Sequence, residues 1–178
     1  MRSRSIGPAA ARSFAALPLL ALLFFCGGCG YRIGMLGHPQ IKTIAIAPVT
    51  NETTSYNAAA QARNILSEVF VTDGTLKLTH LSDADCILYA KVKNVAFSEA
   101  SWSSNNDDQF VPNQWNVAVT LEYSVIQPGQ AQPLAQGAVS GGAQFMTGPD
   151  MEIGRLNGIR QALLSASKSI VIALTEGW

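Results

Sequence analysis

Two cysteines near the N-terminus have the type and spacing that most clearly indicate covalent chemistry. Cys26 and Cys29 are separated by two glycines and follow a mostly apolar run over residues 14–25. Arginines precede that run, and positive charge before a short apolar stretch is the layout of a secretory signal peptide. At about 1.5 Å per residue, the run is too short to span a bilayer as a helix. We therefore expect it to direct export rather than to anchor the chain.

Of the two thiols, Cys29 is the better placed for acylation. Gly27 and Gly28 supply the small residues that a signal peptidase needs at its cut, whereas two phenylalanines stand directly before Cys26. A cysteine in the first mature position resembles a bacterial lipoprotein box, although Cys26 stands where such boxes usually carry Leu. The resemblance implies a diacylglycerol thioether on Cys29 and acylation of its new amino group. Alternatively, both cysteines belong to an ordinary signal peptide, or they form a small redox pair.

Lipidation would divide the chain into three parts. Residues 1–28 would be the signal peptide, 29–40 a lipidated N-terminus with a Gly- and Pro-punctuated linker, and 41–178 a single domain. Acyl chains contribute about 0.8 kcal/mol per buried methylene, and two or more chains give stable anchoring. We expect the acyl chains to hold the protein at a membrane while its body stays in water.

Charge and side-chain chemistry exclude several classes of protein. The chain has 12 Lys+Arg and 12 Asp+Glu; three arginines precede residue 29, which leaves 9 basic against 12 acidic residues and a net charge of about −3. Such a charge does not suit a nucleic-acid partner. Cys86 would be the one free thiol of the mature chain, so no internal disulfide is expected, and its apolar surroundings favour a buried hydrophobe over a nucleophile.

No residue pattern indicates an enzyme. His38 lies in the linker and His80 within a strand pattern, and neither fits a catalytic triad or a zinc site. Two acidic pairs lie at turns, where Asp bends the chain for structural reasons: Asp83 with Asp85, and Asp107 with Asp108. Residues 105–108 lack the spaced ligands of a calcium loop. We expect no catalytic residue, no metal and no cofactor.

The first half of the domain has a strand, helix, strand pattern. Residues 41–48 read as a short half-buried strand with Ile44 and Ile46 on its apolar face. Thr and Ser of the following TNETTS segment are able to cap an amphipathic helix over 57–72, which Asp73-Gly74 ends. Residues 75–81 alternate as a second strand, so a parallel crossover is expected.

In three longer runs, apolar and polar residues then alternate. This pattern is typical of an antiparallel meander with one face exposed to solvent. In the first, from Cys86 to Ala100, Leu88, Ala90, Val92 and Ala96 share one face. The second covers 114–127 and presents Val117, Val119 and Leu121, and the third covers 133–145 and presents Val139 and Phe145. The polar segment Ser98–Gln114 would be a long hairpin loop, which either probes a partner or lipid with Trp102 or is mobile.

A final amphipathic helix over 149–175 completes the fold, with Thr147 as a possible cap. Gly154 and Gly158 lie one turn apart within it; they allow close approach to another backbone, or belong to ordinary helix-on-sheet packing. The sequence predicts an α+β domain in which two helices pack on one face of a four- to five-stranded, mixed, mostly antiparallel sheet.

The sheet face without helices must meet water, lipid or a partner. We interpret it as a candidate interaction surface, with a merely solvated face as the alternative. Lys91 and Lys93 on this face, and Trp102 in the 98–114 segment, are the candidate contacts to a partner or to lipid. The predicted face carries the following residues: Ile87, Tyr89, Lys91, Lys93, Asn116, Thr120 and Glu122.

Three segments of the chain resemble the LPS-assembly lipoprotein (LptE) family. They are CGYR, the strand and loop APVTNET, and ADCILYAKV, and the order of elements agrees over nearly the whole mature chain. This family is the small subunit of the outer-membrane lipopolysaccharide translocon. The resemblance implies a large outer-membrane β-barrel and lipopolysaccharide as partners, with the body inside the barrel lumen as plug and assembly aid. Only Cys29 is carried over as a matched functional position.

The resemblance also implies a location. Gly30 after the cysteine, rather than Asp, resembles lipoproteins that are sorted to the outer membrane. We therefore expect a lipid-anchored outer-membrane protein that faces the periplasm or lies inside a barrel lumen. The alternative function is an accessory or binding lipoprotein of another envelope secretion or transport machine.

The choice of acylation site is testable by substitution. Cys29→Ala should leave an unacylated precursor or a soluble periplasmic form, because it removes the thiol that would carry the diacylglycerol. The matched Cys26→Ala variant should be acylated like the wild type. Metabolic labelling with palmitate measures both, and a labelled product from the Cys29→Ala variant would contradict the assignment.

Overall fold

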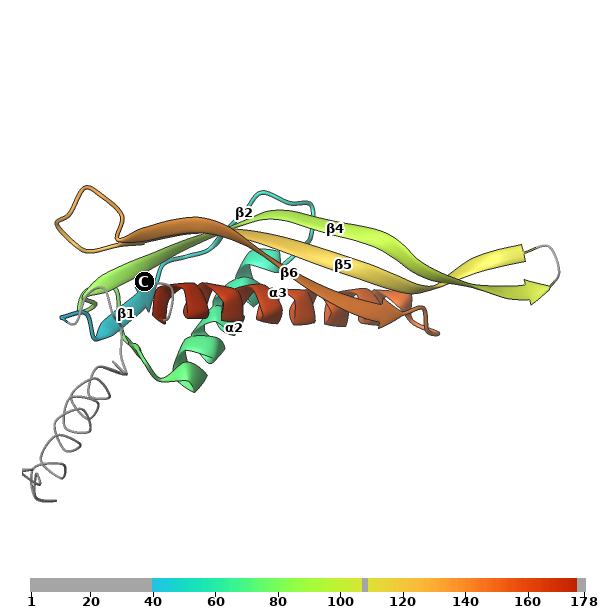
Figure 1. Cartoon of the computed structure of the whole chain (residues 1–178), viewed down its shortest axis with the longest axis horizontal. Helices are drawn as coiled ribbons and strands as arrows, with labels where there is room; N and C mark the ends of the chain where they lie inside the picture. The colour runs from blue at the N-terminus through green and yellow to red at the C-terminus, as the bar shows by residue number, and fades with distance from the viewer. Residues whose placement is uncertain (1–39, 107–108, 176–178) are drawn as a thin grey trace, which may run out of the picture. The chain divides into compact units, whose positions relative to one another are not determined.

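The computed structural model describes residues 40–106 and 109–175, all within one compact unit, Gly34–Trp178. Cys26 and Cys29 lie outside the described residues, so acylation stays a prediction. Figure 1 shows one layer of strands with both described helices on the same side. In chain order the elements are β1 (Thr43–Ile46), β2 (Thr50–Asn51), α2 (Ala58–Asp73), β3 (Lys77–Leu78), β4 (Cys86–Asn106), β5 (Gln109–Ile126), β6 (Ala135–Met146) and α3 (Met151–Thr175).

The sheet is mixed, as predicted. Its strand order is β3-β1-β4-β5-β6, and β2 also pairs with β4, which makes six strands rather than four or five. β1 is parallel to both β3 and β4, whereas β4, β5 and β6 form an antiparallel meander. The extra strand is β2, a two-residue strand too short to show an alternating pattern in the sequence. The α+β prediction with two helices is confirmed.

In the parallel connection β1-α2-β3, helix α2 ends as predicted but begins without the predicted cap. Gly74 follows α2 with φ 71°, and its N–H donates to the carbonyl of Phe70 at 3.1 Å. Only glycine adopts that conformation without steric cost. At the other end Asn57 has φ 60° and makes no side-chain cap. The prediction that a Thr or Ser of TNETTS caps the helix is therefore wrong.

The expectation of a half-buried first strand is also wrong. Ala45 is 1 % exposed although it faces away from Ile44 and Ile46. β1 lies between the parallel neighbours β3 and β4. Strands with parallel neighbours are commonly buried on both faces. A small apolar residue such as Ala45 on the second face does not reveal in the sequence that this face is also buried.

A bulge changes which β4 side chains reach the core. The register with β5 shifts between Val92 and Asn94. An extra residue at a bulge moves all later side chains to the opposite face. Val95 and Phe97 consequently pack against the core, whereas Ala96, expected on that face, is exposed.

The segment expected to be a long hairpin loop is instead strand. β4 and β5 remain paired as far as Asn106 and Gln109, well beyond Gln114, where the pairing of β5 with β6 ends. Figure 1 shows this two-stranded ribbon continuing past the end of β6. Its polar composition misled the prediction, because a strand pair without a helix beneath it needs no apolar face.

Helix α3 covers the meander through the predicted stripe. Ile159, Leu163 and Ile170 are buried against the sheet. Its N-terminus is capped by Asp150, whose Oδ1 accepts from the N–H groups of Glu152 and Ile153 at 3.0 and 3.1 Å. The expected cap, Thr147, instead donates its hydroxyl to the carbonyl of Pro112. A negatively charged side chain at the N-terminus of a helix also interacts favourably with the helix dipole.

The closest approach between the layers lies at a glycine of the sheet. A Cβ on Gly141 would collide with the backbone of α3, at the carbonyl of Ala162 and the N–H of Ala166. Gly154 and Gly158 of α3 face the ring of Phe145, which would lie 3.2 and 2.7 Å from a Cβ at those positions. Gly158 therefore serves ordinary packing against side chains, whereas Gly154 also approaches sheet backbone, since a Cβ there would lie 3.3 Å from the Met146 carbonyl. The tightest backbone contact is made by Gly141.

Replacing Gly141 with a residue that has a Cβ should push helix α3 away from the sheet. We expect Gly141→Ala to lower the free energy of unfolding by about 3 kcal/mol, because helix backbone cannot move aside as a flexible side chain does. Gly142→Ala is the matched control; its Cβ would meet only the Val117 carbonyl at 3.8 Å. The control should stay within about 0.5 kcal/mol of the wild type. Urea unfolding measures both, and equal stability of the two variants would contradict the close contact.

Candidate interaction surface

The outer face of the sheet, defined as the β4, β5 and β6 side chains that point away from the helices, carries mostly small and polar residues. Rows of paired residues cross the three strands. Thr120 and Ser140 share a hydrogen bond of 2.9 Å between their hydroxyls, and Gln114 donates to Gln144 at 2.8 Å. The rows are Lys91, Glu122 and Ala138; Asn94, Thr120 and Ser140; Ala96, Ala118 and Gly142; and Ser98, Asn116 and Gln144.

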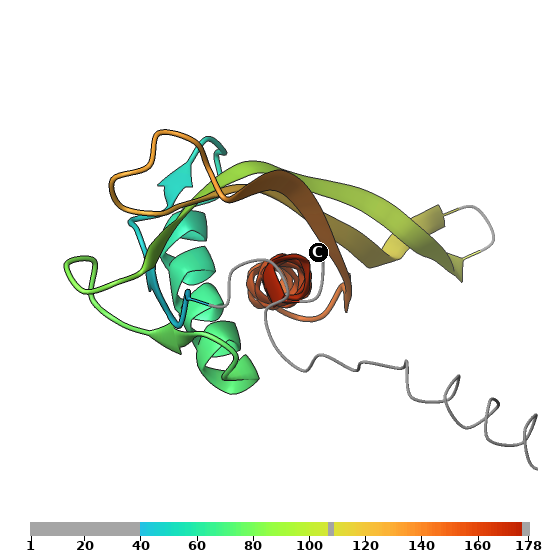
Figure 2. The same ribbon diagram turned by 60° about the vertical axis from the view of Figure 1, so that its left-hand side comes forward.

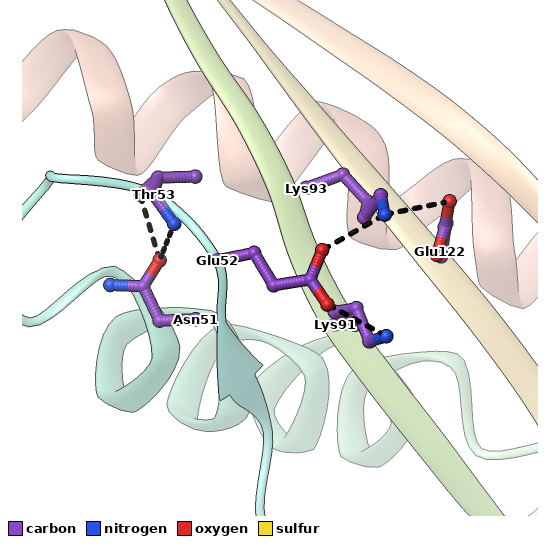
Figure 3. A network of polar contacts seen from close by, with 6 residues as sticks. All are labelled: Asn51, Glu52, Thr53, Lys91, Lys93 and Glu122. Carbon is purple, nitrogen blue, oxygen red and sulfur yellow. Dashed lines mark hydrogen bonds and ion pairs between the residues drawn. The ribbon is translucent and has the colours of Figure 1, made fainter.

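The two predicted lysines meet on this face in a charge network (Figure 3). Lys91 Nζ lies 2.8 Å from Glu52 Oε1, and Lys93 Nζ lies 2.9 Å from Glu52 Oε2. Lys93 also approaches Glu122 Oε1 at 3.7 Å. Exposed ion pairs of this kind contribute little stability individually. Two positive and two negative groups balance one another, so the network holds side chains in place without creating a net charge.

Glu52, which sequence reasoning missed, is placed by the segment after β1. β2 pairs with β4 at Thr50 and Lys91, and the Glu52 N–H donates to the carbonyl of Val92 at 2.9 Å. Asn51 folds the next turn, because its Oδ1 accepts from Thr53 N–H and hydroxyl at 3.0 and 2.7 Å. In the sequence, this ion pairing could have been indicated only by the acidic Glu52 in one segment and the basic Lys91 and Lys93 in a distant one.

A second polar contact connects the same two segments at the other end of β1. Asp85 Oδ2 accepts from the N–H groups of Lys42 and Thr43, each at 2.9 Å, and from the Thr43 hydroxyl at 2.8 Å. The Lys42 N–H, followed by the Thr43 contacts, lowers the pKa of Asp85 below its ordinary value. This carboxylate therefore has the structural role at a turn that the sequence indicated.

Cys86 is buried at the start of β4. Burial, with the neighbouring Asp85 charge as a smaller cause, raises the pKa of its thiol to about 11. A thiol that stays protonated near neutral pH is a poor nucleophile. Its surroundings support the interpretation as a small buried hydrophobe.

A shallow hollow of about 700 Å³ lies beside the charge network. Its lining includes Tyr89, Glu122 and Gln136 on the strands and Thr50 next to Glu52. Tyr89 is 47 % exposed, which gives the hollow an aromatic wall. Within residues 40–106 and 109–175, no group of three His, Cys, Asp or Glu side chains is placed to hold a metal ion. An open hollow with both apolar and polar walls suits contact with another molecule's surface.

Trp102 lies apart from the lysines. It is on the β4 ribbon and 52 % exposed. Nine residues separate it from Lys93, or about 30 Å at the usual rise per residue of a strand. The structure therefore brings Lys91 and Lys93 together but places Trp102 at a separate position.

Neither α2 nor α3, the two helices among the described residues, combines the length and the apolarity needed to cross a bilayer. No protein-family model and no curated protein matches the sequence.

Solved structures share the fold at low sequence identity. A Xanthomonas campestris protein of the DUF330 family has 11% identity and a TM-score of 0.51, over 76% of this chain and 88% of that chain. A Helicobacter pylori protein described as a neuraminyllactose-binding hemagglutinin homologue has 10% identity and a TM-score of 0.51, over 83% and 89%. A minor lipoprotein of Acinetobacter baumannii has 8% identity and a TM-score of 0.48, over 75% and 91%. The first two similarities support the α+β fold.

The charge network predicts an unusual titration. Lys91, then Lys93, lower the pKa of Glu52 from 4.5 to about 2. Because the folded-state pKa lies below the ordinary value, the ion pairs stabilise the fold above about pH 4.5 and lose that contribution as the pH falls toward 2. Carboxyl ¹³C shifts should report a Glu52 midpoint near 2.

Two variants control this titration. Lys93→Gln should raise the Glu52 midpoint, because it removes one of the two cationic partners. Lys77→Gln, on β3 and outside the network, should leave the midpoint unchanged. A wild-type midpoint near 4.5 would show that the ion pairs do not persist in solution.

Proposed function

We propose that this chain is a bacterial envelope lipoprotein whose body binds another polypeptide, and that it serves as the small subunit of the outer-membrane lipopolysaccharide translocon. In this role Cys29 carries the acyl chains and the domain lies within a large β-barrel partner. It acts there as plug and assembly aid and helps lipopolysaccharide reach the outer leaflet. The proposal rests on the sequence resemblance together with the arrangement of the segments that carry it.

The observation that carries the proposal is that the two of these segments within the described residues, APVTNET and ADCILYAKV, lie side by side in the sheet. APVTNET and ADCILYAKV are about thirty residues apart in the sequence, yet β2, which lies within the first segment, pairs in parallel with β4, which begins in the second. The Ala47 N–H donates to the Leu88 carbonyl at 2.9 Å, and Glu52 pairs with Lys91 at 2.8 Å. The shared residues therefore specify how the sheet is assembled, which is what members of one fold family would retain.

The outer face suits a polar lumen. A body enclosed by polar walls needs side chains that form hydrogen bonds and little net charge, and the rows across β4, β5 and β6 have this character. Lys91 and Lys93 already have carboxylate partners. An anionic lipid group would consequently have to compete with Glu52 and Glu122 for these two cations.

Several of the similar folds are described as bacterial lipoproteins, including those from Neisseria meningitidis and Acinetobacter baumannii. That agrees with an envelope lipoprotein but does not select one machine, because one fold hosts many functions. The alternative, an accessory lipoprotein of another envelope secretion or transport machine, is distinguished by the absence of a large barrel gene from the same genome.

The direct test is affinity purification from detergent-solubilised outer membrane. The tagged chain should recover a β-barrel protein at equal stoichiometry, and depletion of the chain should lower surface lipopolysaccharide. Trp102→Ala should reduce recovery of the barrel, because it removes an exposed aromatic contact on the ribbon. Lys168→Gln, on the helical side, should not. Recovery of the chain alone, with normal surface lipopolysaccharide after depletion, would contradict the assignment.

A further inference from the structure

The two edges of the sheet differ in how they are protected. β3 forms one edge with two residues, one of which is Lys77. β6 forms the other edge with twelve residues, Ala135–Met146, and its only strand neighbour among the described residues is β5. Proteins usually shield an edge with a short strand, a charge, a Pro or a bulge. β3 has two of these features, whereas β6 has no charged residue and no Pro.

The free edge of β6 is accessible along its length. Gln136, Ala138, Ser140, Gly142 and Gln144 all point to the outer face and are exposed. On the inner face, α3 touches the strand directly beneath Gly141. Figure 2 shows β6 as the outermost strand, curving beside α3. A long, uncharged edge strand with no strand beside it is a template for another strand.

We propose that a second copy of this chain occupies this edge, in a two-fold dimer in which the two β6 strands pair antiparallel with Ser140 opposite its counterpart. In that register Gln136 lies opposite Gln144 of the other copy, and Ala138 lies opposite Gly142. An antiparallel strand pair is self-complementary under two-fold symmetry. Because β6 carries no charge, the pairing brings no like charges together.

A second copy fits the edge better than a barrel does. A closed barrel has no free strand edge, so its lumen offers side chains rather than an unpaired backbone. The binding mode proposed above therefore leaves the β6 edge unpaired. Another copy of the chain carries the same unpaired backbone, and pairing satisfies both edges at once. The dimer does not depend on the translocon role, since it uses only β6.

Charge placed at the two-fold position tests the register. The full chain, purified in detergent, should be dimeric by light scattering. Ser140→Lys should raise the dissociation constant by roughly fivefold, because two like charges would lie directly opposite each other. Ser140→Glu should do the same, and an equal mixture of the two variants should restore dimers. Ser98→Lys, exposed on β4 of the same face, is the control and should dimerise like the wild type.

Oxidative cross-linking gives a second measurement. Ser140→Cys should form an intermolecular disulfide readily, since opposed Cβ atoms of paired strands lie within about 5.5 Å. Ser98→Cys should not cross-link. Circular dichroism verifies that each variant is folded. A monomeric wild type, an unchanged dimer in Ser140→Lys, or a mixture that fails to restore dimers would each overturn the proposal. Recovery of a barrel by folded Ser140→Lys tests the translocon role separately.

Discussion

The contact between α3 and Gly141 sets the distance between the two layers of this domain. The strand offers no Cβ where the helix passes, so helix and sheet backbones meet directly. Phe145 then lies against Gly154 and Gly158, and its ring meets Phe97 edge to face with centroids 6.3 Å apart. Arg155 covers Phe97 at 5.6 Å. A helix held this closely commits one sheet face to the core and leaves the other for partners.

The sequence revealed the elements whose pattern repeats and missed the contacts that depend on a single residue. Alternation identified β5 and β6, and Gly74 marked the end of α2. The bulge after Val92 has no compositional mark, so Ala96 was placed on the wrong face. Thr147 and Asp150 are equally good caps by type, and tertiary bonding to Pro112 decides between them.

The candidate surface was only partly predicted, because one of its contacts likewise depends on a single residue from a distant segment. Strand alternation placed Lys91 and Lys93 on the uncovered face, but Glu52 comes from a segment that becomes a neighbour only once β2 pairs with β4. The resulting network is electrically balanced, which makes the face a poor attractor of ions from a distance and a good partner for a surface of mixed polarity. Geometry rather than net charge is what a binding molecule would recognise.

The ribbon formed by β4 and β5 beyond Gln114 has a consequence for how the molecule moves. A two-stranded hairpin is marginally stable in water without further strands or a helix. This segment has no β6 beside it. Local opening there costs far less than unfolding the domain, so its amide hydrogens exchange by fluctuations that leave the rest intact. A molecule that binds the ribbon would therefore also make it more rigid.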